Sequence, residues 1–122
     1  MTQEQKDILL KDLCARLPYG VKVEYENEIF DVEYVCPMYE EVKLDIPETW
    51  TIDVSEVKPY LFPHSSMTEE QKEFIKNKFC FEWDVDELID WFHKSLIDYR
   101  GLIPMGLAND ATELSVYTNS DE

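Results

Sequence analysis

Hydrophobic residues recur at helical spacing over residues 2–17, which predicts an amphipathic helix at the start of the chain. Thr2 and Gln5 have the spacing of a capping box, and Pro18 and Gly20 mark the end of the helix. The side chains expected to face the core are Leu9, Leu10, Leu13, Cys14 and Leu17.

From residue 21 to residue 54 apolar and polar residues alternate, which predicts four short strands, each buried on one face. Turns are expected at Asn27-Glu28 and Pro47-Glu48, and Pro37 ends the second strand. The short links predict an antiparallel meander, either an open sheet covered by helices or a curled, SH3-like barrel. The inward-facing residues expected are Val21, Val23, Tyr25, Phe30, Val32, Tyr34, Cys36, Val42, Leu44, Ile46, Trp50, Ile52 and Val54.

Residues 57–63 contain two prolines, so we expect an extended connector across the core. Thr68 is the predicted cap of a helix that continues to about Phe79, with Phe74, Ile75 and Phe79 facing inward.

Asp84 and Glu87 form a capping box for the last predicted helix. Gly101 suits the position after its final turn, and Pro104 prevents the helix from restarting. Its expected inward stripe is Val85, Leu88, Ile89, Phe92 and Leu96.

These elements predict an α+β fold with an N-terminal helix, a four-stranded antiparallel meander and two C-terminal helices. One domain is expected over residues 1–117, followed by a flexible polar tail at 118–122.

The charge changes the picture, because 27 acidic residues against 11 basic ones give a net charge of −16. Direct binding to nucleic acid or to anionic lipid requires a basic surface, so we expect neither partner. A basic protein surface would be attracted instead. The alternative is that the charge serves only solubility.

The three cysteines, Cys14, Cys36 and Cys80, are odd in number and widely spaced, which favours buried free thiols in a reducing compartment. The polar, acidic N-terminus does not resemble a secretory signal, and no apolar run approaches membrane-spanning length. We therefore expect a cytoplasmic protein.

Metal, cofactor and catalytic motifs are absent from the sequence. His64 and His93 are far apart and not at ligand spacing from a cysteine, and no phosphate loop or nucleophile motif occurs. We therefore expect no cofactor, no metal and no enzymatic activity. The alternative is a ligand-binding or catalytic pocket formed by Tyr60, His64, His93, Asp98 and Arg100.

One face of the predicted sheet is rich in carboxylates. Same-side residues two apart on a strand lie about 6–7 Å from each other, similar to phosphates along one DNA strand. A solvated strand face is the alternative to a binding surface. The proposed acidic face consists of Glu24, Glu26, Asp31, Glu33, Asp45 and Asp53.

Three stretches, residues 11–23, residues 57–63 with 65–70, and residues 98–108, resemble a group of uncharacterised proteins carried by prophages and mobile elements of gut Bacteroidales. The resemblance implies no activity, substrate or catalytic residue. It implies a phage context inside a bacterial host, and hence a protein that engages host or phage machinery.

The resulting hypothesis is a non-catalytic acidic interaction protein, in its sharpest form a mimic of nucleic acid that blocks a nucleic-acid-binding protein. A small enzyme or ligand-binding domain and a self-associating phage structural component are the alternatives.

Overall fold

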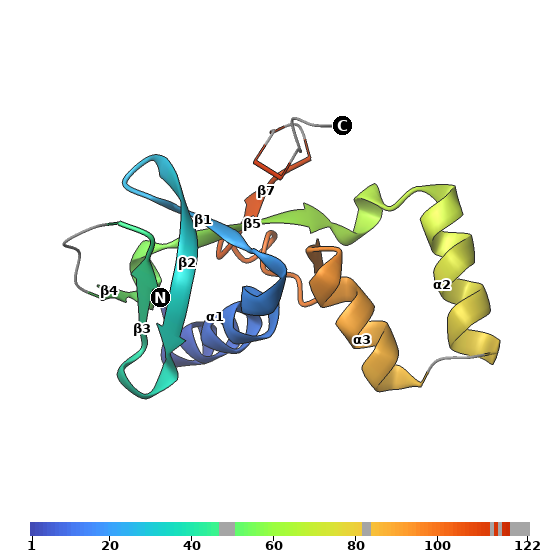
Figure 1. Ribbon diagram of the computed structural model, residues 1–122, viewed down its shortest axis with the longest axis horizontal. Coiled ribbons are helices and arrows are strands. Elements are labelled where there is room, and N and C mark those ends of the chain that lie inside the picture. The colour runs from blue at the N-terminus through green and yellow to red at the C-terminus, as the bar shows by residue number, and fades with distance from the viewer. Residues whose placement is uncertain (47–50, 82–83, 113, 115, 118–122) are drawn as a thin grey trace.

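The computed structural model describes residues 1–46, 51–81, 84–112, 114 and 116–117, with the backbone alone for 79–81. It confirms a mixed α+β fold with an N-terminal helix and an open sheet (Figure 1). The other two helices were predicted to be C-terminal, but two short strands of the same sheet follow them. The helices are α1 (Gln3–Arg16), α2 (Glu69–Phe81) and α3 (Val85–Lys94). The strands are β1 (Lys22–Tyr25), β2 (Glu28–Cys36), β3 (Glu41–Leu44), β4 (Ile52–Asp53), β5 (Lys58–Pro63), β6 (Ile97–Asp98) and β7 (Asn109–Asp110).

Helix α1 begins as the sequence predicts. The Gln5 amide donates to Thr2 Oγ1 at 3.1 Å, and the Thr2 amide donates to Gln5 Oε1 at 2.9 Å, so the capping box is complete. Leu9 and Leu13 are fully buried against the sheet. Cys14 was expected in this stripe but is exposed.

The predicted meander is present, because β1 to β4 pair in sequence order and antiparallel. The sheet does not stop at four strands, as the sequence had suggested. Its path runs β4-β3-β2-β1-β5-β6 with β7 also paired to β5, giving seven strands, and the two ends of the path do not meet. The turn expected at Pro47-Glu48 and the inward Trp50 lie outside the described residues.

Strand β5 replaces the connector that the two prolines predicted. Each proline lies at the end of a two-residue ladder: Pro59 is paired with Val23 of β1, and Pro63 with Asp98 of β6. At a ladder end the missing N–H disrupts little pairing. The strand therefore joins the antiparallel meander to the parallel strands β6 and β7.

A bulge in β2 overturns part of the predicted alternation. The register shifts between Val32 and Tyr34, so Val35 rather than Tyr34 lies opposite the buried Val42 of β3. A bulge adds one residue and reverses which face the following side chains occupy. Tyr34, expected inward, is 45% exposed and lies opposite Lys43.

Helices α2 and α3, here called the helical arm, extend from one end of the sheet, with α2 farthest from it (Figure 1). The predicted capping box of α3 is complete, with the Glu87 amide 3.0 Å from Asp84 Oδ1. The helix ends earlier than predicted, because Leu96 adopts a left-handed conformation at φ 58°. Gly101 therefore lies in the next loop, and the expected inward Val85 is 57% exposed.

The Tyr117 hydroxyl connects the C-terminal segment to the sheet. It accepts from the Lys22 amide and donates to the Tyr60 carbonyl, both at 2.7 Å. These backbone groups lie beside the short β1–β5 ladder, so the phenol links two strands there. Burial raises the pKa of Tyr117 far above its usual value.

Candidate functional site

The six residues of the proposed acidic face lie on or beside strands β1 to β4, and all are exposed or half-buried. Glu24 of β1 is held from the other end of the chain, because Asn109 Nδ2 donates to its carboxylate at 2.8 Å. Glu26 lies in the β1–β2 turn at φ 51°, and Asp45 follows β3 with its amide bonded to the Asp31 carbonyl. The sheet thus presents these carboxylates at the surface, but in different local settings.

Lysines accompany the carboxylates on the strands. Lys22 and Asp31 are directly opposite each other in the β1–β2 register, and Lys22 Nζ lies 2.7 Å from Asp31 Oδ1. Lys43 Nζ lies 3.6 Å from a Glu33 oxygen. Such exposed ion pairs contribute little to stability, yet they divide the negative surface into separate charges. A phosphate backbone has no such interleaved cations.

Asp53 has a local structural role. Its carboxylate accepts the Ser55 amide at 2.9 Å and the Ser55 hydroxyl at 2.7 Å, and Lys6 Nζ lies 3.6 Å away. The bonds from Ser55 are the main reason that the pKa of Asp53 is lowered. Asp53 therefore stabilises the turn that follows β4.

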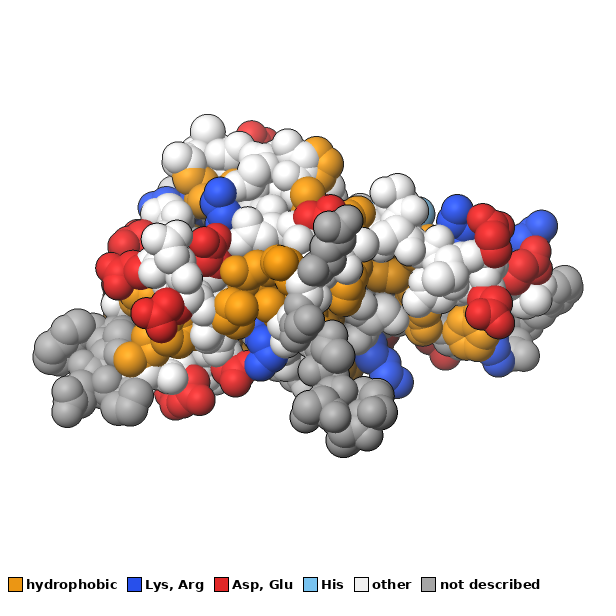
Figure 2. Space-filling model, turned by 90° about the horizontal axis from the view of Figure 1, so that it is seen from above, with side chains coloured by type: hydrophobic (Ala, Val, Ile, Leu, Met, Phe, Trp, Pro, Cys, Tyr) orange, Lys and Arg blue, Asp and Glu red, His pale blue; other side chains and the backbone are white. Residues whose placement is uncertain are grey.

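Charge is not confined to the sheet. Figure 2 shows acidic side chains in two groups, one at the end that carries the strand hairpins and one over α2, with lysines beside both. Glu69 and Glu70 lie in the first turn of α2, where the helix dipole favours carboxylates. The acidic side chains of α2 therefore form a part of the negative surface that is separate from the sheet.

The alternative pocket residues occupy different surroundings. Tyr60 is buried in β5, and burial followed by the nearby Glu24 raises its pKa. His64 is exposed with its ring 5.6 Å from that of Phe92. The Asp98 carboxylate is used by the loop that follows it, accepting the amides of residues 102 and 103 at 2.9 and 2.8 Å.

His93 and Arg100 do lie near each other, in a buried group that joins α1 to α3 and that we call the arginine cluster. The Asp12 carboxylate is its centre, with one oxygen 2.8 Å from Arg16 Nε and the other 3.0 Å from Arg100 Nε. Asp12 and Arg16 are fully buried. The arginine cluster consists of Asp12, Arg16, His93, Tyr99 and Arg100.

Arg16 is satisfied by backbone as well as by Asp12. Its Nη2 donates to the Ile97 carbonyl at 2.7 Å, and its Nη1 donates to the Phe92 carbonyl at 3.3 Å. The Phe92 carbonyl lies in the last turn of α3, where helices leave acceptors unpaired, and the Ile97 carbonyl lies in β6. Arg16 therefore fixes the helical arm to α1.

The Tyr99 ring fills the remaining space of the cluster. Both guanidiniums lie over it, Arg100 at 4.9 Å and Arg16 at 5.7 Å from its centroid. Its hydroxyl lies 2.7 Å from His93 Nε2. Burial, then the charge of Arg16, lowers the pKa of His93, so at neutral pH the imidazole is uncharged.

The sequence analysis did not identify Asp12 and Arg16, although a signal was present. Both fall on the stripe of Leu9 and Leu13, at the helical spacing of residues that share one face. Two opposite charges on an otherwise leucine-lined face indicate a buried ion pair. This signal would have pointed to the joint between α1 and the helical arm.

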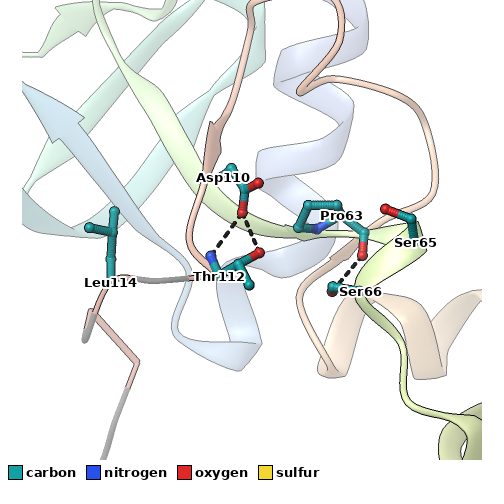
Figure 3. Close-up of a pocket in the computed structure, with 6 residues that line it drawn as sticks. All are labelled: Pro63, Ser65, Ser66, Asp110, Thr112 and Leu114. Carbon is teal, nitrogen blue, oxygen red and sulfur yellow. Dashed lines mark hydrogen bonds between the residues drawn. The ribbon is translucent and has the colours of Figure 1, made fainter.

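One hollow, of about 470 Å³, lies between the end of β5 and the segment after β7 (Figure 3). Its polar groups are bonded locally: Asp110 accepts from the amide and hydroxyl of Thr112, and Ser66 Oγ donates to the Pro63 carbonyl. These bonds stabilise the two turns beside the hollow.

A second hollow, of about 280 Å³, lies between the turn after α1 and the outer side of α3. None of the five alternative pocket residues lines either of these two hollows. The residues that line the second hollow are Tyr19, Glu87, Asp90, Trp91 and Lys94.

Metal-binding groups and membrane spans were sought in the part of the chain that the structure describes. No three His, Cys, Asp or Glu side chains there gather as a metal site would require. No described helix has the length and apolarity to cross a bilayer. The expectation of buried thiols is wrong for Cys14, which is exposed, and for Cys36, which is half-buried.

The fold and these surfaces were compared with known proteins. No family model, no curated protein and no solved structure matches this chain.

Proposed function

We propose that this chain is a non-catalytic interaction protein that binds a basic surface of a partner protein through the carboxylates of its sheet. One contrast supports the proposal. The residue types suited to catalysis, in the arginine cluster, are bonded to one another and to the backbone at the α1–α3 joint. The carboxylates of the sheet instead lie at the surface of a chain with net charge −16.

A negatively charged surface affects which proteins associate with the chain and how fast they do so. Charge complementarity accelerates association with a cationic partner and excludes anionic ones, nucleic acid included. The resemblance of three stretches to proteins of Bacteroidales mobile elements favours a partner in the cytoplasm of a bacterial host. We propose that setting for the interaction.

Mimicry of nucleic acid is the narrower form of this proposal. The acidic residues on neighbouring strands favour it, whereas the pairs Lys22–Asp31 and Lys43–Glu33 weaken the likeness to a phosphate array. The broader form requires exposed carboxylates on the sheet but not the spacing of phosphates, so it is the one we carry forward.

The test compares two variants of equal charge. The sheet variant carries Glu24→Gln, Glu26→Gln, Asp31→Asn and Glu33→Gln, and removing four negative charges from −16 leaves −12. The control carries the same number of neutral substitutions away from the sheet, so it also has charge −12. The control substitutions are Glu4→Gln, Glu69→Gln, Glu70→Gln and Glu73→Gln.

Each protein is immobilised on a resin and incubated with lysate of a gut Bacteroidales bacterium. Bound proteins are then eluted with rising salt. We expect the parent and the control to retain the same basic protein until raised salt releases it, because salt screens exposed charges. The sheet variant should lose it. Equal capture by all three proteins would mean that the sheet carboxylates do not form the binding surface.

A further inference from the structure

The second hollow combines aromatic and acidic side chains in one place. Trp91 is half-buried and Tyr19 is 40% exposed, so both rings contribute surface to it. Glu87 and Asp90 add two carboxylates, and Lys94 completes the lining. Four of these five residues come from α3, and the fifth from the short turn that follows α1.

Helical spacing explains why the α3 residues converge. Glu87, Asp90, Trp91 and Lys94 stand at positions i, i+3, i+4 and i+7, which share one face of a helix. The opposite side of α3 carries Phe92, which is buried. The lining is therefore the outward stripe of a helix whose other face is fixed to the fold.

The two aromatic residues are held in different ways. The Trp91 ring meets the Phe92 ring edge-on at 5.7 Å and lies 6.4 Å from that of Phe74, which limits its rotation. Tyr19 lies in the turn that begins at Leu17 and is closed by Gly20 at φ 76°. The rings thus form two walls of a hollow from separate elements.

The carboxylates that line the hollow favour a positively charged ligand. One Glu87 oxygen accepts the Asp84 amide at 3.1 Å in the capping box. Among the described residues Asp90 has no hydrogen bond or ion pair, and acts on His93 only through its charge. A cation placed over aromatic faces and beside a free carboxylate gains from both contacts. Guanidinium is preferred to ammonium because it is planar, stacks on aromatic rings and binds carboxylates through two N–H groups.

We propose that this hollow binds an arginine side chain of a partner protein, held between Tyr19 and Trp91 with its guanidinium on Asp90. The inference rests on the proposed function: the arginine would belong to the same partner protein and would be recognised by the helical arm. It adds a surface distinct from the sheet carboxylates, since the lining residues belong to α3 and to the turn after α1.

The experiment is an NMR titration of the full chain with N-acetyl-arginine amide, followed at the Trp91 indole N–H. The signal is assigned by its absence in Trp91→Phe. N-acetyl-lysine amide and the uncharged N-acetyl-norleucine amide are the comparison probes. We expect a saturable shift with the arginine probe, a weaker affinity for the lysine probe and no shift with norleucine.

Three variants give effects of stated sign. Tyr19→Ala should weaken arginine binding about two- to fivefold, as expected for loss of an exposed cation–π contact. Asp90→Asn should weaken it about two- to fivefold by removing the charge partner. Lys94→Gln should strengthen it about twofold, because a like charge leaves the rim.

Several outcomes would overturn the inference: an unmoved indole signal, equal binding of norleucine, equal binding of lysine, or no effect of Tyr19→Ala and Asp90→Asn. The sheet variant separates this inference from the proposed function, since it should bind the arginine probe unchanged. Arginine binding without any salt-released protein partner would refute the proposed function alone. A partner lost on sheet neutralisation, with an unmoved indole signal, would refute the arginine site alone.

Discussion

Helix α1, which packs on the sheet, and the two helices of the helical arm all carry amphipathic stripes in their sequence, but these stripes are buried to different extents. Leu9 and Leu13 of α1 are fully buried, because the sheet covers their face. In the arm, Phe74 is 43% and Val85 57% exposed, and α2 lies beyond α3 away from the sheet (Figure 1). An amphipathic stripe therefore predicts a helix, but the tertiary arrangement decides how far the stripe is buried.

The two regions meet at the arginine cluster, so breaking it should give the largest effect. Asp12→Ala removes the carboxylate shared by Arg16 and Arg100 and leaves a fully buried guanidinium without its counter-charge. Loss of one partner of a buried pair costs about 3–5 kcal/mol. Urea unfolding followed by circular dichroism measures the change in the free energy of unfolding.

The double replacement Asp12→Leu with Arg16→Met is the matched control. An apolar pair leaves no fully buried charge unpaired, although Arg100, whose side chain is 22% exposed, still loses Asp12. The double variant should therefore restore part of the stability that Asp12→Ala loses. If Asp12→Ala unfolds at the same urea concentration as the parent chain, the cluster does not hold the arm to α1.

The second prediction compares the stripes directly. Leu13→Ala removes a fully buried side chain and should destabilise the protein by about 2–5 kcal/mol. Val85→Ala removes an exposed side chain from the arm and should cost less than about 0.5 kcal/mol. Similar losses in the two urea titrations would mean that the arm is as tightly packed as the region around α1.

The sequence predicted the features that depend on residues close together in the chain, and missed those that depend on distant residues. The capping boxes at Thr2 and Asp84 are complete because each depends on residues three apart. The strand β5 was missed because Pro59 is compatible with a strand only at a ladder end, which depends on partners far along the chain. The bulge after Val32 likewise depends on pairing with β3.

The candidate sites show the same limit. Exposure of the sheet carboxylates followed from alternation, but their pairing with Lys22 and Lys43 depends on strand register. Tyr19 and Trp91 are 72 positions apart in the numbering, and no local pattern brings them to one hollow. Asp98 was assigned to the alternative pocket on residue type alone, whereas its bonds to the loop that follows β6 depend on the folded backbone.

A third prediction concerns the attachment of the C-terminal segment to the sheet. Tyr117→Phe removes the hydroxyl that bonds the Lys22 amide and the Tyr60 carbonyl, and should cost about 1–3 kcal/mol. Because the folded pKa of Tyr117 is raised, the unfolded chain loses this proton first as pH rises above about 10. Parent stability should fall there, and the fall should be smaller in Tyr117→Phe.

The smallest predicted effect is the acid response of the joint itself. Burial and Arg16 lower the folded pKa of His93 below the unfolded value of about 6.5, so the unfolded chain binds the proton at a higher pH. Stability should therefore decline as pH falls through 6.5 and stop declining, for this group, below the folded pKa. Protonation would add a third cation beside Arg16 and Arg100, opposed by Asp12 and by Asp90.

His93→Gln keeps a polar side chain near the Tyr99 hydroxyl but cannot titrate. Urea midpoints measured between pH 5 and pH 8 should show a smaller decline for this variant than for the parent. Parallel declines would place the acid sensitivity in other groups. A decline of the urea midpoint in the parent but not in His93→Gln would show that protonation of His93 weakens the joint. The joint connects the sheet and α1 to the helical arm, so its protonation would lower the stability of both regions.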